Sequence, residues 1–186
     1  MKVVVFVDVQ NDFIDGALPV DKDREVTKKI AKYAYVNNCE HVPMVATRDT
    51  HFNDYLDTFE GKKLPIKHCI ARTDGWKIAS ELMPFIAPAN IIDKFTFGAI
   101  DGLHERINKI DEQIASIYNE HVTEIEICGF CTNVCVVNNA LILRAAFPKT
   151  KMTLLENLCA GTTKEDHDAA VAVMKSCQID VCDAVI

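Results

Sequence analysis

Short runs of Val, Ile and Leu alternate with longer segments of helical spacing, and this alternation constrains the fold most strongly. Nearly continuous apolar runs are typical of parallel strands that are covered on both faces. Strand–helix alternation of this kind predicts an α/β fold, a doubly wound parallel sheet flanked by helices in a three-layer sandwich with right-handed crossovers. The expected strands are residues 2–8, 42–48, 90–94, 124–130 and 152–157, and the expected helices are residues 23–37, 75–86, 103–119, 134–147 and 164–176.

The size and charge of the chain exclude several classes of protein. We expect a single domain over residues 1–186, a length that suits one compact core. A net charge of −7 argues against a nucleic-acid partner, which requires a basic face. The first apolar run, residues 3–7, is too short for a signal peptide or a membrane span. We therefore expect a cytoplasmic protein without a membrane partner, whose eight cysteines are reduced thiols.

Chemically reactive residues fall at or just beyond the carboxyl ends of four predicted strands. Asp8 ends the first strand, Asp49 follows the second, Lys94 ends the third, and Cys135 lies shortly after the fourth. Open α/β sheets bind their ligands outside the carboxyl ends of the strands. The four side chains are therefore expected to converge on one edge of the sheet.

Asp8 and Lys94 each allow two interpretations. The Asp8 carboxylate either caps its loop by accepting backbone hydrogen bonds or, beside a thiol, acts as a general base. Lys94 either reaches solvent, as most lysines do, or lies beside a thiolate and lowers the pKa of that thiol.

Three cysteines lie within the sequence CGFCTNVC at residues 128–135. A zinc knuckle requires a second pair of ligands, and the chain has no second C-x-x-C. Cys128 falls within an apolar strand and is interpreted as a buried thiol. Cys135 is expected in the first turn of a helix, where backbone N–H groups favour a thiolate and bind an oxyanion, so we interpret it as a nucleophile. The other thiols fit no ligand pattern and are interpreted as buried or incidental: Cys39, Cys69, Cys159, Cys177 and Cys182.

A second group of polar residues lies between positions 49 and 68. Asp49 and His51 are spaced D-x-H, and Glu60 and His68 follow. Carboxylate oxygens and imidazoles together suit zinc, manganese or iron in the divalent state. Taken singly, these residues are equally well explained as surface groups of a loop. The remaining histidines lie in polar surroundings and are interpreted as surface residues: His41, His104, His121 and His167.

The sequence resembles the isochorismatase-like cysteine hydrolases and, among them, the nicotinamidase-related amidases. The matching motifs occur in the order of that family and span nearly the whole chain. They are DVQNDF at 8–13, TRDTH at 47–51, LPIKHCIARTDGW at 64–76, DKFTFGA at 93–99 and GFCTNVCV at 129–136.

The resemblance implies roles for specific residues. It implies a catalytic triad of Asp8, Lys94 and Cys135, and a cis peptide bond that lets the N–H groups of Cys131 and Cys135 form an oxyanion hole. It also implies a metal that receives the ring nitrogen of the substrate, for which zinc is the first candidate and manganese and iron are alternatives. The ligands that the resemblance implies are Asp49, His51, Glu60 and His68.

The chain departs from the family at the substrate pocket. Phe95 follows the catalytic lysine where nicotinamidases usually have Gly, and an aromatic residue that usually precedes the last metal histidine is missing. Phe13 and Leu18 are the candidates for an apolar wall. The resemblance implies hydrolysis of a small carboxamide with release of ammonia, nicotinamide first. The alternatives are another small amide or an N-carbamoyl compound, isochorismatase activity, and a non-catalytic binding member of the family. Relatives are often oligomers, so a homo-oligomer is expected.

Overall fold

The computed structural model describes residues 1–186, which build a six-stranded, wholly parallel sheet in the order β3-β2-β1-β4-β5-β6. The α/β class is therefore confirmed. The strands are β1 (Lys2–Val7), β2 (Met44–Asp49), β3 (Ile91–Lys94), β4 (Glu124–Phe130), β5 (Lys151–Ala160) and β6 (Asp180–Cys182). The helices are α1 (Asn11–Ile14), α2 (Glu25–Cys39), α3 (Phe59–Lys63), α4 (Leu103–Tyr118), α5 (Val137–Ala146) and α6 (Lys164–Ser176).

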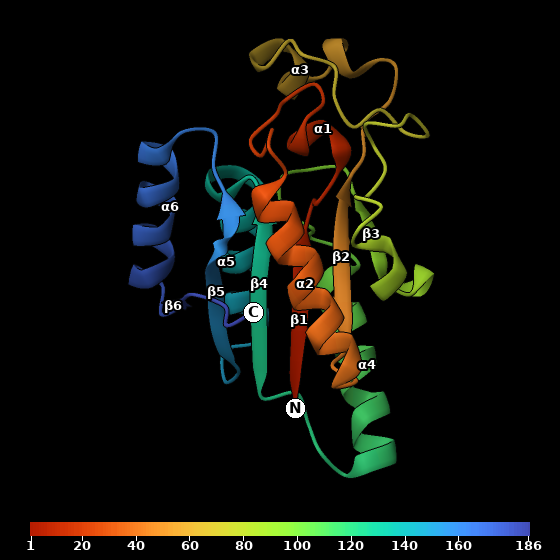
Figure 1. Ribbon diagram of the computed structural model, residues 1–186, viewed down its shortest axis with the longest axis vertical. Helices are drawn as coiled ribbons and strands as arrows, with labels where there is room; N and C mark the ends of the chain where they lie inside the picture. Colours follow the sequence, from red (N-terminus) through yellow and green to blue (C-terminus); the bar gives the residue numbers. More distant parts are fainter.

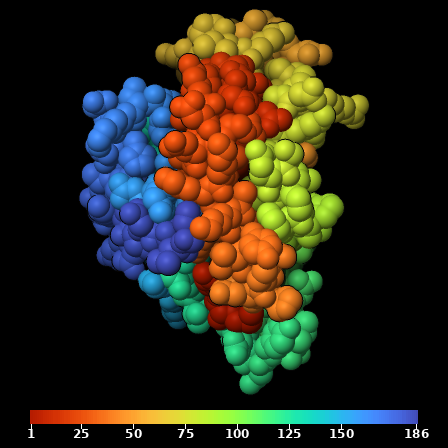
Figure 2. Space-filling model, in the orientation of Figure 1, coloured from red at the N-terminus to blue at the C-terminus, as the bar shows by residue number.

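Helices cover both faces of the sheet. In Figure 1, α2 crosses the front of the sheet, whereas α4 and α5 lie behind it. The strand order reverses between β1 and β4, because the chain first builds outward to β2 and β3 and then returns to the other side of β1. Such a reversal opens a crevice at the carboxyl ends of the strands. The chain that follows β2, drawn in ochre, projects over this end of the sheet and forms the top of the molecule in Figure 2.

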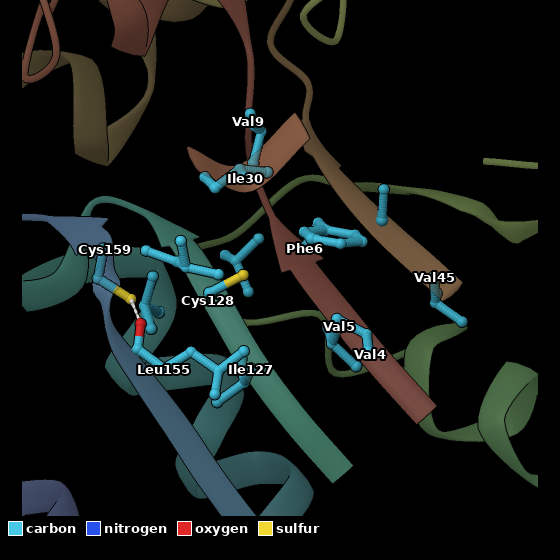
Figure 3. Packing of buried hydrophobic residues seen from close by; sticks show 14 of the residues in the cluster. Val4, Val5, Phe6, Val9, Ile30, Val45, Ile127, Cys128, Leu155 and Cys159 are labelled. Atoms are coloured by element: carbon cyan, nitrogen blue, oxygen red, sulfur yellow. Dashed lines mark hydrogen bonds between the residues drawn. The ribbon is translucent and has the colours of Figure 1, made fainter. Parts of the chain in front are cut away.

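The central strand β1 lies at the middle of the core. Val3 to Val7 are completely buried, as a continuous apolar run in a parallel sheet requires. Phe6 belongs to the same buried cluster as residues of the neighbouring strands, and Figure 3 shows Ile127 of β4 beside Leu155 of β5. This apolar packing fixes the strand ends that carry the polar residues of the site.

Gly129 marks the point where β4 bends toward the site. Its φ of +126° is a conformation that side chains rarely adopt, and a Cβ there would lie 2.0 Å from the carbonyl oxygen of Val7. The pairing of β4 with β5 also shifts register between Ile127 and Gly129. Glycine therefore lets β4 approach β1 closely just before the segment that contains Cys135.

The prediction of a helix over residues 75–86 is wrong. The segment instead pairs with the chain that follows β1, where Asn11 N donates to Lys77 O and Ala79 N donates to Val9 O. Only a single 3₁₀ turn, Met83–Phe85, forms there, and Lys77 O and Ala79 N bond to another segment instead of within a helix. The three-residue strand β6 was not predicted, since so short a run gives no periodic signal. No helix of the chain is both long and apolar enough to span a bilayer.

Truncation of Phe6 should destabilise the fold strongly. Phe6→Ala is expected to lower the free energy of unfolding by about 3–5 kcal/mol, because it leaves a cavity in a fully buried site. Phe59→Ala is the matched control, since Phe59 is 81% exposed and its loss should change stability by no more than about 0.5 kcal/mol. Urea denaturation measures both, and equal losses for the two variants would contradict this description of the core.

Candidate active site

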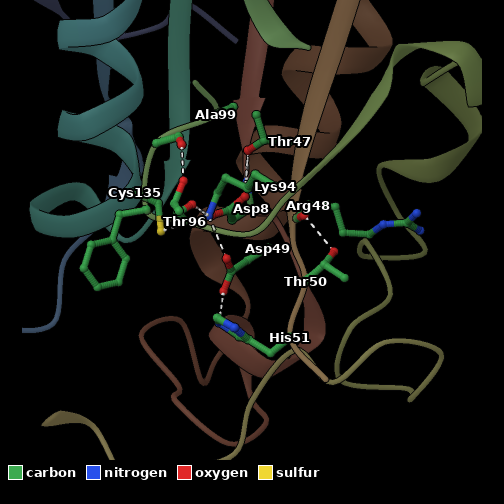
Figure 4. Close-up of polar contacts among 12 residues, drawn as sticks. Asp8, Thr47, Arg48, Asp49, Thr50, His51, Lys94, Thr96, Ala99 and Cys135 are labelled. Carbon is green, nitrogen blue, oxygen red and sulfur yellow. Dashed lines mark hydrogen bonds and ion pairs between the residues drawn. The ribbon is translucent and has the colours of Figure 1, made fainter. Parts of the chain in front are cut away.

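Lys94, the last residue of β3, carries a buried ammonium between two carboxylates. Its Nζ lies 2.8 Å from Asp8 Oδ2 and 2.8 Å from Asp49 Oδ1, and it donates to Thr96 O at 3.1 Å. Burial lowers the pKa of Lys94, but the negative charges around it, Asp8 first, outweigh burial and raise that pKa well above its ordinary value. Lys94 is therefore a permanent cation at the centre of the cluster in Figure 4.

Asp8 directly follows β1 and is completely buried. Its φ of +48° lies in the left-handed region, which aspartate tolerates better than most residues. Thr47 Oγ1 donates to Asp8 Oδ1 at 2.6 Å. Oδ2 accepts no hydrogen bond of good geometry despite its short contact with Lys94, so it has a lone pair available for a proton. Burial is the main cause that raises the pKa of Asp8, which makes its carboxylate a stronger base.

Cys135 lies in a π-helical turn, η4 (Thr132–Val136), that leads into α5. Its Sγ is 3.5 Å from Lys94 Nζ, and the residue is 3% exposed. Burial raises the pKa of this thiol well above its ordinary value, and the opposing effect of Lys94 does not outweigh it. Burial therefore favours the neutral thiol over the thiolate that the sequence indicated.

The peptide bond between Phe130 and Cys131 is cis, as the resemblance implied. Cys131 itself is buried and lines the same cavity as Cys135. Residues 131 and 135 thus lie at the two ends of one short turn that begins where β4 ends.

Gln10 joins the chain after β1 to Asp49 at the end of β2, a role that the sequence did not indicate. Its Nε2 donates to Asp49 O and to Trp76 O, both at 2.9 Å, and its Oε1 accepts from Asp49 N at 2.7 Å. Gln10 is completely buried. A polar residue just beyond a buried strand was the available signal, but it did not reveal the partner.

Asp49, His51 and His68 offer ligand atoms that all lie within 4.8 Å of one another. His51 Nε2 is 3.0 Å from Asp49 Oδ2, and His68 Nε2 is 3.6 Å from the same oxygen. Glu60 Oε1 adds a second carboxylate at 3.5 Å from His51 Nε2. The structure therefore brings together all four residues that were predicted as metal ligands.

The donor set fits a divalent metal on two observations. His68 Nδ1 contacts Ile66 O at 2.8 Å, so this nitrogen carries the proton and Nε2 faces the other ligands with its lone pair. His51 Nε2 is buried and has no hydrogen bond of good geometry, although it lies close to Asp49. Burial raises the pKa of Asp49, but His51 and Lys94 outweigh it and lower that pKa to about 2, so Asp49 is ionised.

One cavity of about 420 Å³ reaches both parts of the site. Its lining includes Cys135 and also Asp49, Glu60 and His68. Ten of its 15 lining residues are hydrophobic, so a bound molecule meets few polar groups other than these. The predicted wall residues Phe13 and Leu18 are among the lining residues.

Phe95, where the sequence departs from its relatives, does not line this cavity. Its ring is 61% exposed and stacks on Phe52 with the ring centroids 6.0 Å apart. Phe95 in place of Gly therefore changes the outer surface beside Lys94. It does not fill the cavity that Cys135 lines.

Comparisons with known proteins agree with this architecture. The isochorismatase domain family matches residues 2–185. A nicotinamidase/pyrazinamidase of Mycobacterium tuberculosis is 29% identical over 203 residues, covering 99% of this chain and 100% of that protein. The crystal structure of a Pyrococcus horikoshii pyrazinamidase in complex with zinc superposes with a TM-score of 0.81 at 25% identity, covering 98% of this chain and 99% of that one. A yeast nicotinamidase shares the fold, with a TM-score of 0.76 at 22% identity over 99% of this chain and 100% of that one.

The ligand group should bind one divalent ion per chain. His51→Ala is expected to weaken Zn²⁺ binding more than about tenfold, because even loss of a group behind a ligand costs 10- to 100-fold in affinity. Calorimetric titration of metal-stripped protein measures this change. His121→Ala is the control, since His121 is exposed and pairs with Asp111. Neither residue belongs to the ligand group. Equal affinities for the two variants would contradict the assignment.

Proposed function

The chain belongs to the isochorismatase family and is an amidohydrolase related to the nicotinamidases, and from this premise we propose that it cleaves a small carboxamide through a thioester on Cys135. Nicotinamide is the first candidate substrate, and nicotinate and ammonia are the products. One observation supports the proposal most directly. The Lys94 ammonium contacts both the Cys135 thiol and the Asp8 carboxylate, and the cavity that Cys135 lines is also lined by candidate metal ligands.

The first half of the reaction forms the thioester. Asp8 takes the proton from Cys135 Sγ, and the sulfur attacks the carboxamide carbon. Lys94 stabilises the developing thiolate at 3.5 Å. The N–H groups of residues 131 and 135 are proposed to hold the oxyanion, and Asp8 then gives its proton to the departing nitrogen, so that ammonia leaves.

The second half hydrolyses the thioester. Asp8, again a carboxylate, takes a proton from water as the water oxygen attacks the thioester carbon. The carbon–sulfur bond breaks, and the sulfur regains its proton as the acid leaves. Asp49, His51, Glu60 and His68 would hold the divalent ion, with zinc as the candidate, and the ion would supply a Lewis acid for the ring nitrogen of the substrate.

A larger amide is the second candidate substrate, and the cavity favours it. Nine separate water molecules occupy roughly 270 Å³ of liquid, so the nine bonded heavy atoms of nicotinamide need less than that. The cavity offers about 420 Å³, mostly between apolar walls. An apolar substituent on the ring would fill the remaining space.

Replacement of the nucleophile should abolish turnover. Cys135→Ala is expected to release no ammonia from nicotinamide, because no thioester can form, while its thermal unfolding stays close to that of wild type. Cys177→Ala is the matched control, since Cys177 is a half-buried thiol at the end of α6. Wild-type activity in Cys135→Ala would disprove the cysteine mechanism. Activity on an N-carbamoyl compound alone would redirect the substrate.

As the pH falls, kcat/KM should begin to decrease at a pH above 3.8, the usual pKa of an aspartate. Burial raises the pKa of Asp8, and the carboxylate that acts as the base is lost as the pH falls through that raised pKa. We call this decrease the acid limb of the profile. Thr47→Val should move the limb to still higher pH, because it removes a hydrogen bond that stabilises the carboxylate. A pH profile of ammonia release measures both. A limb that moves to lower pH in Thr47→Val would contradict the role of Asp8.

Substrate size can be read from a matched series. If the larger amide is the better substrate, 5-propylnicotinamide should exceed nicotinamide in kcat/KM by about tenfold or more, the scale on which apolar pockets discriminate methylene groups. Ammonia release from nicotinamide and its 5-methyl, 5-ethyl and 5-propyl derivatives measures the trend. A steady decline along the series would favour nicotinamide itself.

A further inference from the structure

A half-buried histidine contacts the turn that contains Cys135. His167 Nδ1 lies 2.9 Å from Thr132 Oγ1, and His167 Nε2 lies 3.5 Å from Glu156 Oε1. The His167 side chain is 16% exposed, so it keeps an edge at the surface, but both ring nitrogens lie near other side chains, which the sequence did not indicate. The three residues come from η4, α6 and β5, elements that carry neither Asp8 nor Lys94.

Thr132 occupies a critical place in the turn. It follows Cys131 directly and begins η4, in which Cys135 is the fourth residue. Cys131 O accepts hydrogen bonds from Val134 N at 3.0 Å and from Val136 N at 3.1 Å. Because these bonds close the turn around Thr132, a shift of Thr132 would move both ends of the turn together.

The next residue, Asn133, is held by the same neighbouring segment. Its Nδ2 donates to Thr162 Oγ1 at 2.8 Å, and its Oδ1 accepts from Thr162 N at 2.9 Å. Thr162 Oγ1 in turn contacts Asp166 Oδ2 at 3.1 Å. Two consecutive residues of the turn are therefore held by neighbouring parts of the chain, Asn133 by the loop between β5 and α6 and Thr132 by α6 itself. The contact through His167 is the more buried of the two, because Thr132 is completely buried.

Glu156, His167 and Thr132 have the order of an acid, a histidine and a hydroxyl, but they do not form a second nucleophilic site. The Thr132 side chain is completely buried and does not line the cavity, so no substrate carbonyl reaches its hydroxyl. Its hydroxyl can only fix the backbone to which it belongs.

We infer that His167 is a positioning residue, which sets the backbone N–H groups of residues 131 and 135 through its hydrogen bond to Thr132. This inference rests on the proposed function, in which those N–H groups hold the oxyanion. Oxyanion donors act at 2.7–3.1 Å from the developing charge, and a misplacement of about 1 Å can cost roughly 100-fold in rate. Loss of the His167 contact should therefore lower kcat much more than it raises KM.

Three variants test the contact. His167→Leu and Thr132→Val each remove it, and each is expected to lower kcat for ammonia release by roughly 10- to 100-fold with little change in KM. His167→Asn places an amide near the position of Nδ1 and should recover most of the loss. The double variant should be no slower than the slower single one, because both substitutions remove the same contact. Asp168→Asn is the control on α6, since Asp168 pairs only with Lys164 at the surface.

A binding measurement separates this inference from the proposed function. Pyridine-3-carbaldehyde can accept the Cys135 S–H across its C=O bond, which gives a thiohemiacetal whose oxygen lies where the oxyanion would form. His167→Leu should weaken binding of the aldehyde by about tenfold or more, and should leave binding of 3-methylpyridine, which lacks that oxygen, unchanged.

The outcomes are distinct. Unchanged kcat and unchanged aldehyde affinity in His167→Leu would overturn the inference. Equal decreases of kcat in His167→Leu and His167→Asn would also overturn it. So would an equal loss of affinity for the aldehyde and for 3-methylpyridine in His167→Leu. Wild-type protein that binds the aldehyde but releases no ammonia would contradict the proposed function alone, and the aldehyde affinities of the variants would still decide the role of His167. Wild-type protein that neither binds the aldehyde nor hydrolyses amides would end both.

Discussion

The site depends on one ammonium that is buried between two carboxylates. Lys94 Nζ contacts Asp8 and Asp49 at the same distance, 2.8 Å, so a single cation joins the end of β1 to the end of β2. Removing one partner of such a buried pair typically costs about 3–5 kcal/mol, because the remaining charge loses its compensation. Here the two carboxylates outnumber the one ammonium, and a divalent ion beside Asp49 would balance the excess negative charge.

This arrangement also explains why the sulfur waits as a thiol. Cys135 and Asp8 are both buried, and burial raises the pKa of each because it disfavours the charged form. A raised carboxyl pKa makes Asp8 a better base, and Lys94 lies close enough to the sulfur to stabilise the anion as it forms. In the proposed mechanism, Asp8 would therefore take the proton from the sulfur as the sulfur attacks the substrate carbonyl.

Much of the site followed from the sequence, because parallel strands end at one edge of the sheet and reactive side chains stood at those ends. The remainder depended on contacts between distant parts of the chain, which spacing does not encode. Residues 75–86 have helical spacing, yet Lys77 and Ala79 bond to the chain after β1, a tertiary contact that local spacing does not encode. The partner of His167, Thr132, lies 35 positions earlier, so polar neighbours in the sequence indicated a surface residue, whereas the structure places His167 against the turn that contains Cys135. The cis peptide bond before Cys131 came only from the family resemblance.

Covalent chemistry at one sulfur is the central claim, and trapping the intermediate tests it most directly. Wild-type protein would be mixed with nicotinamide, quenched in acid within the first turnovers, digested and analysed by mass spectrometry. The account predicts a nicotinoyl group on the peptide that contains Cys135, formed as ammonia appears and removed when the denatured adduct is treated with hydroxylamine. Ammonia release without any acyl adduct on that peptide, together with turnover in a chain that lacks the Cys135 sulfur, would contradict it.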